Sequence, residues 1–182
     1  HNHWHIDNSK KDKPDHTIVA SQEGLSLVQR NPDGSFSLSE ISKGATGDRP
    51  PQSGSGEVKK GKIGAKLLLA TIEPMHGNQV VVYLGEALNN EMQRIVLDDS
   101  FAQGHAIWCA DFDGDGKDEV VAAHREAKAD GTPPGIYLYQ STDGSGEHWK
   151  RTQLDSPMAC EDLWCDDFDG DGKVDILAGG RS

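Results

Sequence analysis

Short runs of apolar and β-branched residues recur along the chain, and turns rich in glycine, proline and aspartate separate them. Runs of this length and composition predict β-strands, and no segment follows the spacing of an amphipathic helix. One series of predicted strands is Ile18–Ala20, Lys66–Thr71, Val120–Val121 and Ile176–Leu177. A second series is Gly24–Gln29, Gln79–Leu84 and Gly135–Gln140, and a third is Phe36–Ser42, Met92–Asp98 and Trp149–Asp155.

The sequence itself also repeats. The segment DFDGDGKDEVVAA at Asp111–Ala123 returns as DFDGDGKVDILAG at Asp167–Gly179, and each copy follows a Trp-Cys pair. Trp4 falls in the same column of an earlier, degenerate copy. We expect repeats at 1–53, 54–102, 103–158 and 159–182, of which the last is incomplete. Three or four short strands per repeat predict an all-β fold, a β-propeller of which this chain supplies roughly three and a half blades.

A propeller closes on itself, so an incomplete set of blades implies partners. We expect about seven blades in the parent protein. Either further sequence lies before His1 and after Ser182, or a partner chain closes the ring. Without such partners, the end blades would expose edges that favour association with other chains.

The repeated acidic loop has the composition of a calcium site. Carboxylates stand at positions 1, 3, 5 and 9 of each copy, and a lysine carbonyl at position 7 would complete the ligands. The predicted ligands are Asp111, Asp113, Asp115, Lys117 and Glu119 in one loop, and Asp167, Asp169, Asp171, Lys173 and Asp175 in the other. Hard oxygen ligands in this number suit Ca²⁺. Because position 12 is alanine and a strand follows, an EF-hand is excluded. The alternative is a solvated acidic turn without metal.

Composition narrows the possible partners. The net charge of −12 argues against binding to nucleic acid or to a membrane surface. No apolar run reaches the roughly 18 residues of a membrane span. Cys109, Cys160 and Cys165 form no disulfide pattern, so we expect buried thiols. Calcium loops favour an extracytoplasmic or secreted protein. Free thiols slightly favour an intracellular one, so the sequence leaves the compartment open.

The loop-plus-strand repeat resembles the FG-GAP/VCBS repeats of calcium-binding β-propellers, which serve as adhesion receptors, lectin-like modules and lyases. Ile72–Tyr83 (IEPMHGNQVVVY) and Gly104–Glu119 (GHAIWCADFDGDGKDE) further resemble the propeller of the aldos-2-ulose dehydratase family. In that family the propeller precedes cupin-type domains, and the enzymes dehydrate oxidised sugars such as 1,5-anhydrofructose and glucosone. The resemblance implies that His76, His105 and His1 match family histidines and that the parent protein is a lyase.

The histidines are the candidate catalytic residues. His1 and His105 share one repeat column at the start of the innermost strand, and His76 lies in a loop at one end of a blade. The three could meet near the mouth of the central channel and hold Zn²⁺ or another divalent metal. Such a metal would polarise the keto oxygen of the sugar, and His76 or His105 would remove the α-proton. Tyr83 or Glu73 could assist.

Other functions fit the same sequence. A non-catalytic propeller would bind glycans or protein partners through exposed loops such as Lys43–Ser55. A propeller polysaccharide lyase would act on uronic-acid polymers, although an acidic surface disfavours such polyanions. The alternative to a catalytic role for His76 and His105 is a structural one, in which they bond loop backbone.

The other polar and aromatic residues have simpler interpretations. The remaining histidines that we interpret as surface or strand-edge residues are His16, His124 and His148. Trp108 and Trp164 recur with the repeat, which indicates core between blades. Asp118 neighbours the ligand positions and is expected to be solvated. Glu161-Asp162 takes the place of His105-Ala106 in the last repeat, as either a channel carboxylate or an exposed pair.

Overall fold

The computed structural model describes residues 2–6, 8, 15–46 and 53–181, and β-strands joined by turns make up this part of the chain. None of these residues is helical. A helix that could span a membrane is therefore absent from the described ranges. The all-β prediction is confirmed.

Fourteen strands form four antiparallel sheets, each with its strands in sequence order. The first sheet contains β1 (Asn2–Ile6), β2 (His16–Ser21), β3 (Gly24–Arg30) and β4 (Phe36–Ser42). The second contains β5 (Glu57–Ile63), β6 (Lys66–Glu73), β7 (Gln79–Gly85) and β8 (Gln93–Asp98). The third contains β9 (Gly104–Ala110), β10 (Glu119–His124), β11 (Gly135–Ser141) and β12 (Trp149–Asp155). The fourth contains β13 (Ala159–Asp166) and β14 (Asp175–Arg181).

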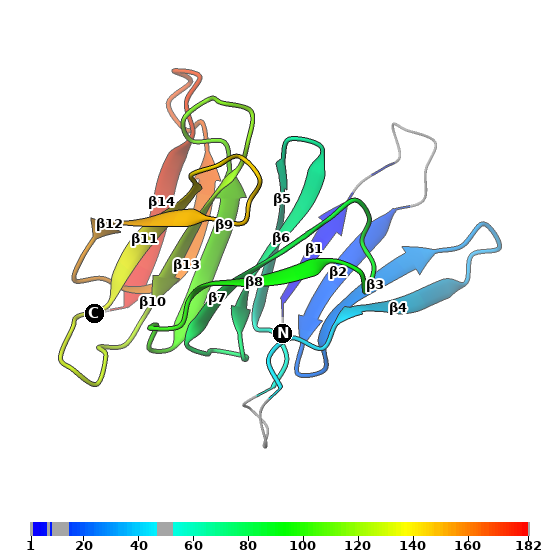
Figure 1. The fold of residues 1–182 in the computed structure, drawn as a ribbon, viewed down its shortest axis with the longest axis horizontal. Coiled ribbons are helices and arrows are strands. Elements are labelled where there is room, and N and C mark those ends of the chain that lie inside the picture. Colours follow the sequence, from blue (N-terminus) through cyan, green and yellow to red (C-terminus); the bar gives the residue numbers. More distant parts are fainter. Residues whose placement is uncertain (1, 7, 9–14, 47–52, 182) are drawn as a thin grey trace.

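The sheets stand side by side like blades (Figure 1), and the first strand of each sheet contacts the first strand of the next. β1 contacts β5, β5 contacts β9, and β9 contacts β13. First strands that gather around a common axis are typical of a propeller. The described sheets do not close into a ring (Figure 1), so the chain forms a partial β-propeller.

Apolar side chains fill each boundary between neighbouring sheets. The three clusters include Leu25, Val58 and Val81 at the first boundary, Leu68, Val82 and Val120 at the second, and Ala123, Cys160 and Leu163 at the third. The middle strands β6, β7 and β10 are buried on both faces. This double burial explains why their sequences are continuous apolar runs rather than alternating ones.

The fourth sheet has an uncovered apolar face. Trp164 is 53% exposed and Leu177 is 61% exposed, whereas their counterparts one repeat earlier, Trp108 and Val121, are buried. An apolar sheet face is stable when another layer covers it. The uncovered face fits a fragment that packs against further blades.

The interpretation of the recurring tryptophans as core between blades fits Trp108, which is buried, whereas Trp164 is exposed. Trp108 and Trp164 lie outside the three apolar clusters and form a row of rings with Trp4. Ring centroids are 5.5 Å apart for Trp4 and Trp108, and 4.5 Å apart for Trp108 and Trp164. Lys59 of the second sheet places Nζ 5.5 Å and 5.3 Å from the centroids of Trp4 and Trp108. A cation–π contact therefore takes the place of a tryptophan in that sheet.

The structure also corrects the interpretation of His124 and Asp118. His124 is fully buried rather than at the surface, because it ends a strand that is covered on both faces and its ring stacks on Tyr137. Asp118 is bonded rather than solvated. Its N–H donates to the Lys62 carbonyl oxygen at 2.9 Å, and its Oδ2 accepts from the Lys62 N–H at 2.8 Å. This pair of bonds joins the second and third sheets.

Candidate functional site

A tight turn between β6 and β7 carries His76. The turn closes where the Gly77 N–H donates to the Pro74 carbonyl oxygen at 2.7 Å. His76 has a φ of +54°, in the left-handed region that residues with a β-carbon seldom adopt. A β-carbon at Gly77 would lie 2.3 Å from the Glu73 carbonyl oxygen. The turn therefore requires glycine directly after His76.

Two more glycines bring this turn against the first strands of the sheets. By strand register, Gly56 occupies the column of His105 in the second sheet. A β-carbon at Gly56 would lie 3.0 Å from the His76 backbone nitrogen, so the absence of a side chain leaves room for the turn. Gly104 donates its N–H to the Gly77 carbonyl oxygen at 2.8 Å. As a result the His76 and His105 rings stack, with centroids 4.7 Å apart and planes at 28°.

His105, the second residue of β9, has one ring nitrogen fixed by a hydrogen bond. Its Nδ1 lies 2.7 Å from the Glu161 backbone carbonyl oxygen, which can only accept, so Nδ1 carries the proton of this bond. Its Nε2 lies 3.6 Å from the carboxylate oxygen Oε2 of Glu161. Nε2 is therefore the atom that can take up or release a proton. The His105 side chain is 21% exposed, which leaves it accessible to a small ligand.

Arginines from two sheets hold the Glu161 carboxylate. Arg125 follows β10 and donates from Nη1 to Glu161 Oε2 at 2.9 Å. The Nε and Nη2 atoms of Arg125 donate to the Gln103 side-chain oxygen at 3.0 and 2.8 Å. Arg181, at the end of β14, has Nε 3.3 Å from Glu161 Oε1. The hydrogen bond from Arg125 is the main cause that lowers the pKa of Glu161, so this carboxylate is charged at neutral pH.

Backbone strain coincides with this cluster. Among the described residues, the non-glycine residues with positive φ are His76 at +54° and Gln103 at +53°. A residue held in such a conformation costs about 1–3 kcal/mol. Strain at both ends of one small cluster points to a functional constraint there.

The surroundings of His76 lower the pKa of its ring. Burial lowers the pKa of His76, and the neighbouring His105 and Arg125 lower it further, while Glu161 raises it. The lowered pKa favours the neutral ring at pH 7. A neutral ring can donate or accept a hydrogen bond without repelling the cations beside it.

The described side chains do not complete a metal site at the histidine pair. Within residues 2–6, 8, 15–46 and 53–181, the groups of His, Cys, Asp and Glu that could hold a metal are the two aspartate loops. His1 lies outside the described residues. The Arg125 guanidinium beside Glu161 also disfavours a second cation. A histidine-held Zn²⁺ or similar metal therefore stays a prediction.

The sequence motifs do not single out Gln103, Arg125 or Arg181. One available signal is that Arg125 and Arg181 stand at the same position in successive copies of the repeat. Their role depends on the packing of the third sheet against the fourth, which no local pattern reports. Glu161 is not an exposed pair with Asp162, because its backbone and side chain both approach His105.

Hydrogen bonds within the acidic loops turn the carboxylates inward. In the first loop, the N–H groups of Gly114 and Gly116 donate to Asp111 at 2.8 and 2.9 Å. The corresponding glycines of the second loop donate to Asp167 at 2.7 and 2.9 Å. Positive φ values at these glycines allow the backbone to wrap around a central point.

Each loop brings three carboxylates together. Oxygens within 4.8 Å of one another come from Asp111, Asp113 and Asp115 in the first loop, and from Asp167, Asp169 and Asp175 in the second. This set of hard oxygen donors fits Ca²⁺. The predicted ligands Glu119 and Asp171 lie outside these groups. Glu119 accepts from the Phe112 N–H and Asp171 from the Lys173 N–H, both at 2.8 Å.

The acidic loops and the histidine pair lie at opposite ends of their blade. His105 is near the start of the seven-residue strand β9, and the first acidic loop follows its end. Strands rise about 3.3 Å per residue, so β9 separates the two features by roughly 20 Å. The loops are thus too far away to contact a ligand on His105.

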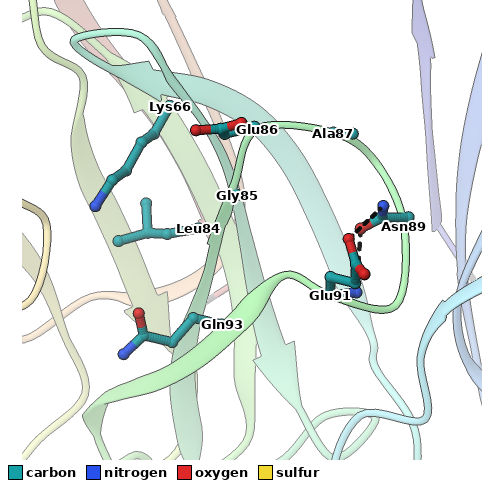
Figure 2. A pocket seen from close by; sticks show the side chains of 8 residues that line it. All are labelled: Lys66, Leu84, Gly85, Glu86, Ala87, Asn89, Glu91 and Gln93. Atoms are coloured by element: carbon teal, nitrogen blue, oxygen red, sulfur yellow. Dashed lines mark hydrogen bonds between the residues drawn. The ribbon is translucent and has the colours of Figure 1, made fainter.

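A cavity of about 420 Å³ opens elsewhere on the second sheet (Figure 2). Its lining residues are Lys66, Leu84, Gly85, Glu86, Ala87, Asn89, Glu91 and Gln93. Lys66 begins β6, whereas the turn with His76 follows the end of β6. This cavity is therefore not part of the histidine site.

Tyr83 and Glu73 do not assist at the histidine pair in this structure. The Tyr83 hydroxyl donates to Glu73 Oε1 at 2.6 Å, and Arg94 Nη2 donates to Glu73 Oε2 at 2.7 Å. The Tyr83 and Glu73 side chains are buried. Both polar groups bond other residues of the protein and are closed to a ligand.

The blades and their acidic loops define the class of protein to which this chain is similar. The model of the FG-GAP-like repeat family matches residues 111–178, from the first acidic loop to β14. The match confirms the resemblance to FG-GAP repeats over this segment.

A particular enzyme is also similar to the chain. Aldos-2-ulose dehydratase of Phanerodontia chrysosporium is 30% identical over 125 residues, which is 60% of this chain and 14% of that relative. The chain thus spans a small part of the relative's length. Both comparisons agree with a propeller portion.

Proposed function

We propose that this chain is the propeller portion of a carbohydrate-active lyase that removes water from an oxidised (keto) sugar, with His105 and His76 assisting. The observation that carries the proposal is the stacked histidine pair with the Glu161 carboxylate 3.6 Å from His105 Nε2. The strained backbone of His76 supports a functional role. Similarity to a protein named aldos-2-ulose dehydratase supports the substrate class.

His105 Nε2 is placed to act as the general base. It accepts the proton from the carbon beside the carbonyl group, and the electron pair of that C–H bond forms the enolate. The enolate then expels the hydroxyl group on the next carbon, which takes the proton from the His105 imidazolium and leaves as water, and an unsaturated ketone remains. The carboxylate of Glu161 stabilises the imidazolium formed on His105. The neutral ring of His76 can donate a hydrogen bond to the keto oxygen.

We also infer that each acidic loop binds one Ca²⁺ ion in a structural role. The inference is supported by the convergence of three carboxylates within 4.8 Å in each loop. A bound Ca²⁺ ion would offset the repulsion between these carboxylates and fix the loop at the end of the blade. The separation along β9 argues against a direct part in proton transfer.

The substitution His105→Ala tests the catalytic proposal. In the complete protein that contains these residues, the variant should lose turnover of glucosone or 1,5-anhydrofructose, followed by absorbance of the conjugated product. Its thermal midpoint should stay close to that of the wild type. The control is His148→Ala, because the His148 side chain is 77% exposed and lies outside the site. Full turnover by the His105 variant would overturn the proposal and favour a propeller that only binds glycans or protein partners.

A further inference from the structure

Arg125 connects parts of the site that belong to different sheets. Gln103 precedes β9, Arg125 follows β10, and Glu161 lies in β13. We propose that Arg125 is a positioning residue that holds the Glu161 carboxylate beside His105 and so keeps the proton-transfer group in its reactive arrangement. This inference rests on the proposed function and extends it to residues outside the histidine motif.

The side chain of Arg125 is fixed by several bonds at once. Its guanidinium donates to Glu161 from Nη1 and to Gln103 from both Nε and Nη2. Its backbone N–H donates to the Gln103 carbonyl oxygen at 3.1 Å. The positive φ of Gln103 shows that the backbone is strained where it meets this arginine. A planar guanidinium can make these bonds in one geometry, which a lysine ammonium cannot reproduce.

Arg181 provides a natural comparison for Arg125. It stands at the same repeat position one copy later and contacts the other oxygen of Glu161, with Nε at 3.3 Å from Oε1. Its side chain is 53% exposed, whereas that of Arg125 is 21% exposed. Exposed ion pairs are weak because water screens them. Arg125 is therefore the residue that fixes Glu161, and Arg181 adds a smaller effect.

The same arrangement acts electrostatically on His76. In the described part of the chain, the charged and titratable groups that act on His76 include His105, Arg125 and Glu161, and Arg181 contacts Glu161 from outside. Arg125 lowers the pKa of His76 and Glu161 raises it. Removal of the arginine or of the carboxylate should therefore move the pKa of His76 in opposite directions.

The kinetic test compares Arg125→Met, Arg125→Lys and Arg181→Met in the complete protein. Misplacement of a catalytic group by about 1 Å can lower turnover about 100-fold, so Arg125→Met should lower kcat by about 10- to 100-fold with little change in KM. Arg125→Lys should retain part of this activity, and Arg181→Met should lose less than either. Arg30→Met serves as the control, because Arg30 is exposed at the end of β3. If Arg125→Met loses activity only because its thermal midpoint falls to the assay temperature, the positioning role is overturned.

A second measurement does not depend on activity. A crystal structure of Arg125→Met should show the Glu161 carboxylate displaced from its place 3.6 Å from His105 Nε2, whereas a structure of Arg181→Met should show it unmoved. If the carboxylate keeps its place in Arg125→Met, the inference is lost even when the wild type is an active dehydratase. If the carboxylate moves and the wild type does not turn over keto sugars, the positioning role stands and the proposed function fails. The two ideas can thus fail separately.

Discussion

Glu73 carries a buried charge whose removal should lower stability by a predictable amount. Its carboxylate is fully buried, and four groups bond it: the hydroxyls of Tyr83 and Ser55 at 2.6 and 3.1 Å, and Nη2 and Nε of Arg94 at 2.7 and 3.0 Å. Ser42 of the first sheet donates to Tyr83 at 3.0 Å. The network therefore ties the first sheet to the second.

The substitution Glu73→Ala leaves these donors without their acceptor. Breaking a buried ion pair by removing one partner costs about 3–5 kcal/mol. The lower end applies here because the Arg94 side chain is 33% exposed and also donates to Gln79 at 2.8 Å. Glu73→Gln keeps an oxygen acceptor for Tyr83 and loses the charge, so it should cost about 1.5–3 kcal/mol. In a chain of this size, 1 kcal/mol lowers the thermal midpoint by about 2–4 °C.

Equilibrium unfolding in urea measures these differences directly. Glu91→Ala, at an exposed carboxylate, is the control. The double substitution Glu73→Ala with Arg94→Ala should be less destabilising than the sum of its single substitutions, because no unpaired charge remains. A Glu73→Ala variant within about 0.5 kcal/mol of the wild type would refute the account of the network. Loss of turnover in Tyr83→Phe at unchanged stability would return Tyr83 to the list of catalytic candidates.

Three other predictions concern the loops, the turn and the thiols. Asp111→Asn should reduce the rise in thermal midpoint on addition of calcium. Calcium at 100 times the Kd of one site would stabilise the folded chain by about 2.7 kcal/mol. Asp143→Asn, at an exposed turn that binds the Ser145 N–H, should leave this rise unchanged. Gly77→Ala should cost about 1–3 kcal/mol because its β-carbon would meet the Glu73 carbonyl oxygen at 2.3 Å; Gly179→Ala, with nothing within 4 Å, is its control in the same unfolding assay. Cys160 is free and buried, and burial raises the pKa of its thiol to about 11. A maleimide should therefore label Cys160 slowly at neutral pH until urea unfolds the chain, and fast labelling of the native state would contradict this.

The sequence pattern predicted the strands and the acidic loops, because each of these forms within a short segment of the chain. The strands follow from short apolar runs, and the inward-turned carboxylates follow from the spacing of aspartate and glycine within a single loop. Burial of His124 could not be read in the same way, because it depends on Phe101 and Tyr137, whose rings lie 4.8 and 5.8 Å from its own. Trp164 repeats the sequence of Trp108 and yet is exposed, since exposure is decided by whether a further sheet covers it.

The candidate site also depends on contacts between sheets, which the local sequence pattern does not report. Its histidines stand in recognisable motifs, and Gly77 marks the turn that carries one of them. Arg125 and Gln103 bond each other beside the third sheet, and they meet Glu161 only when the fourth sheet packs against the third. β9 holds this cluster at one end and an acidic loop at the other. On the proposed structural role of calcium, its removal should lower stability first, and it should affect the proposed proton transfer only as far as loosening of the loop changes how β9 packs against β13.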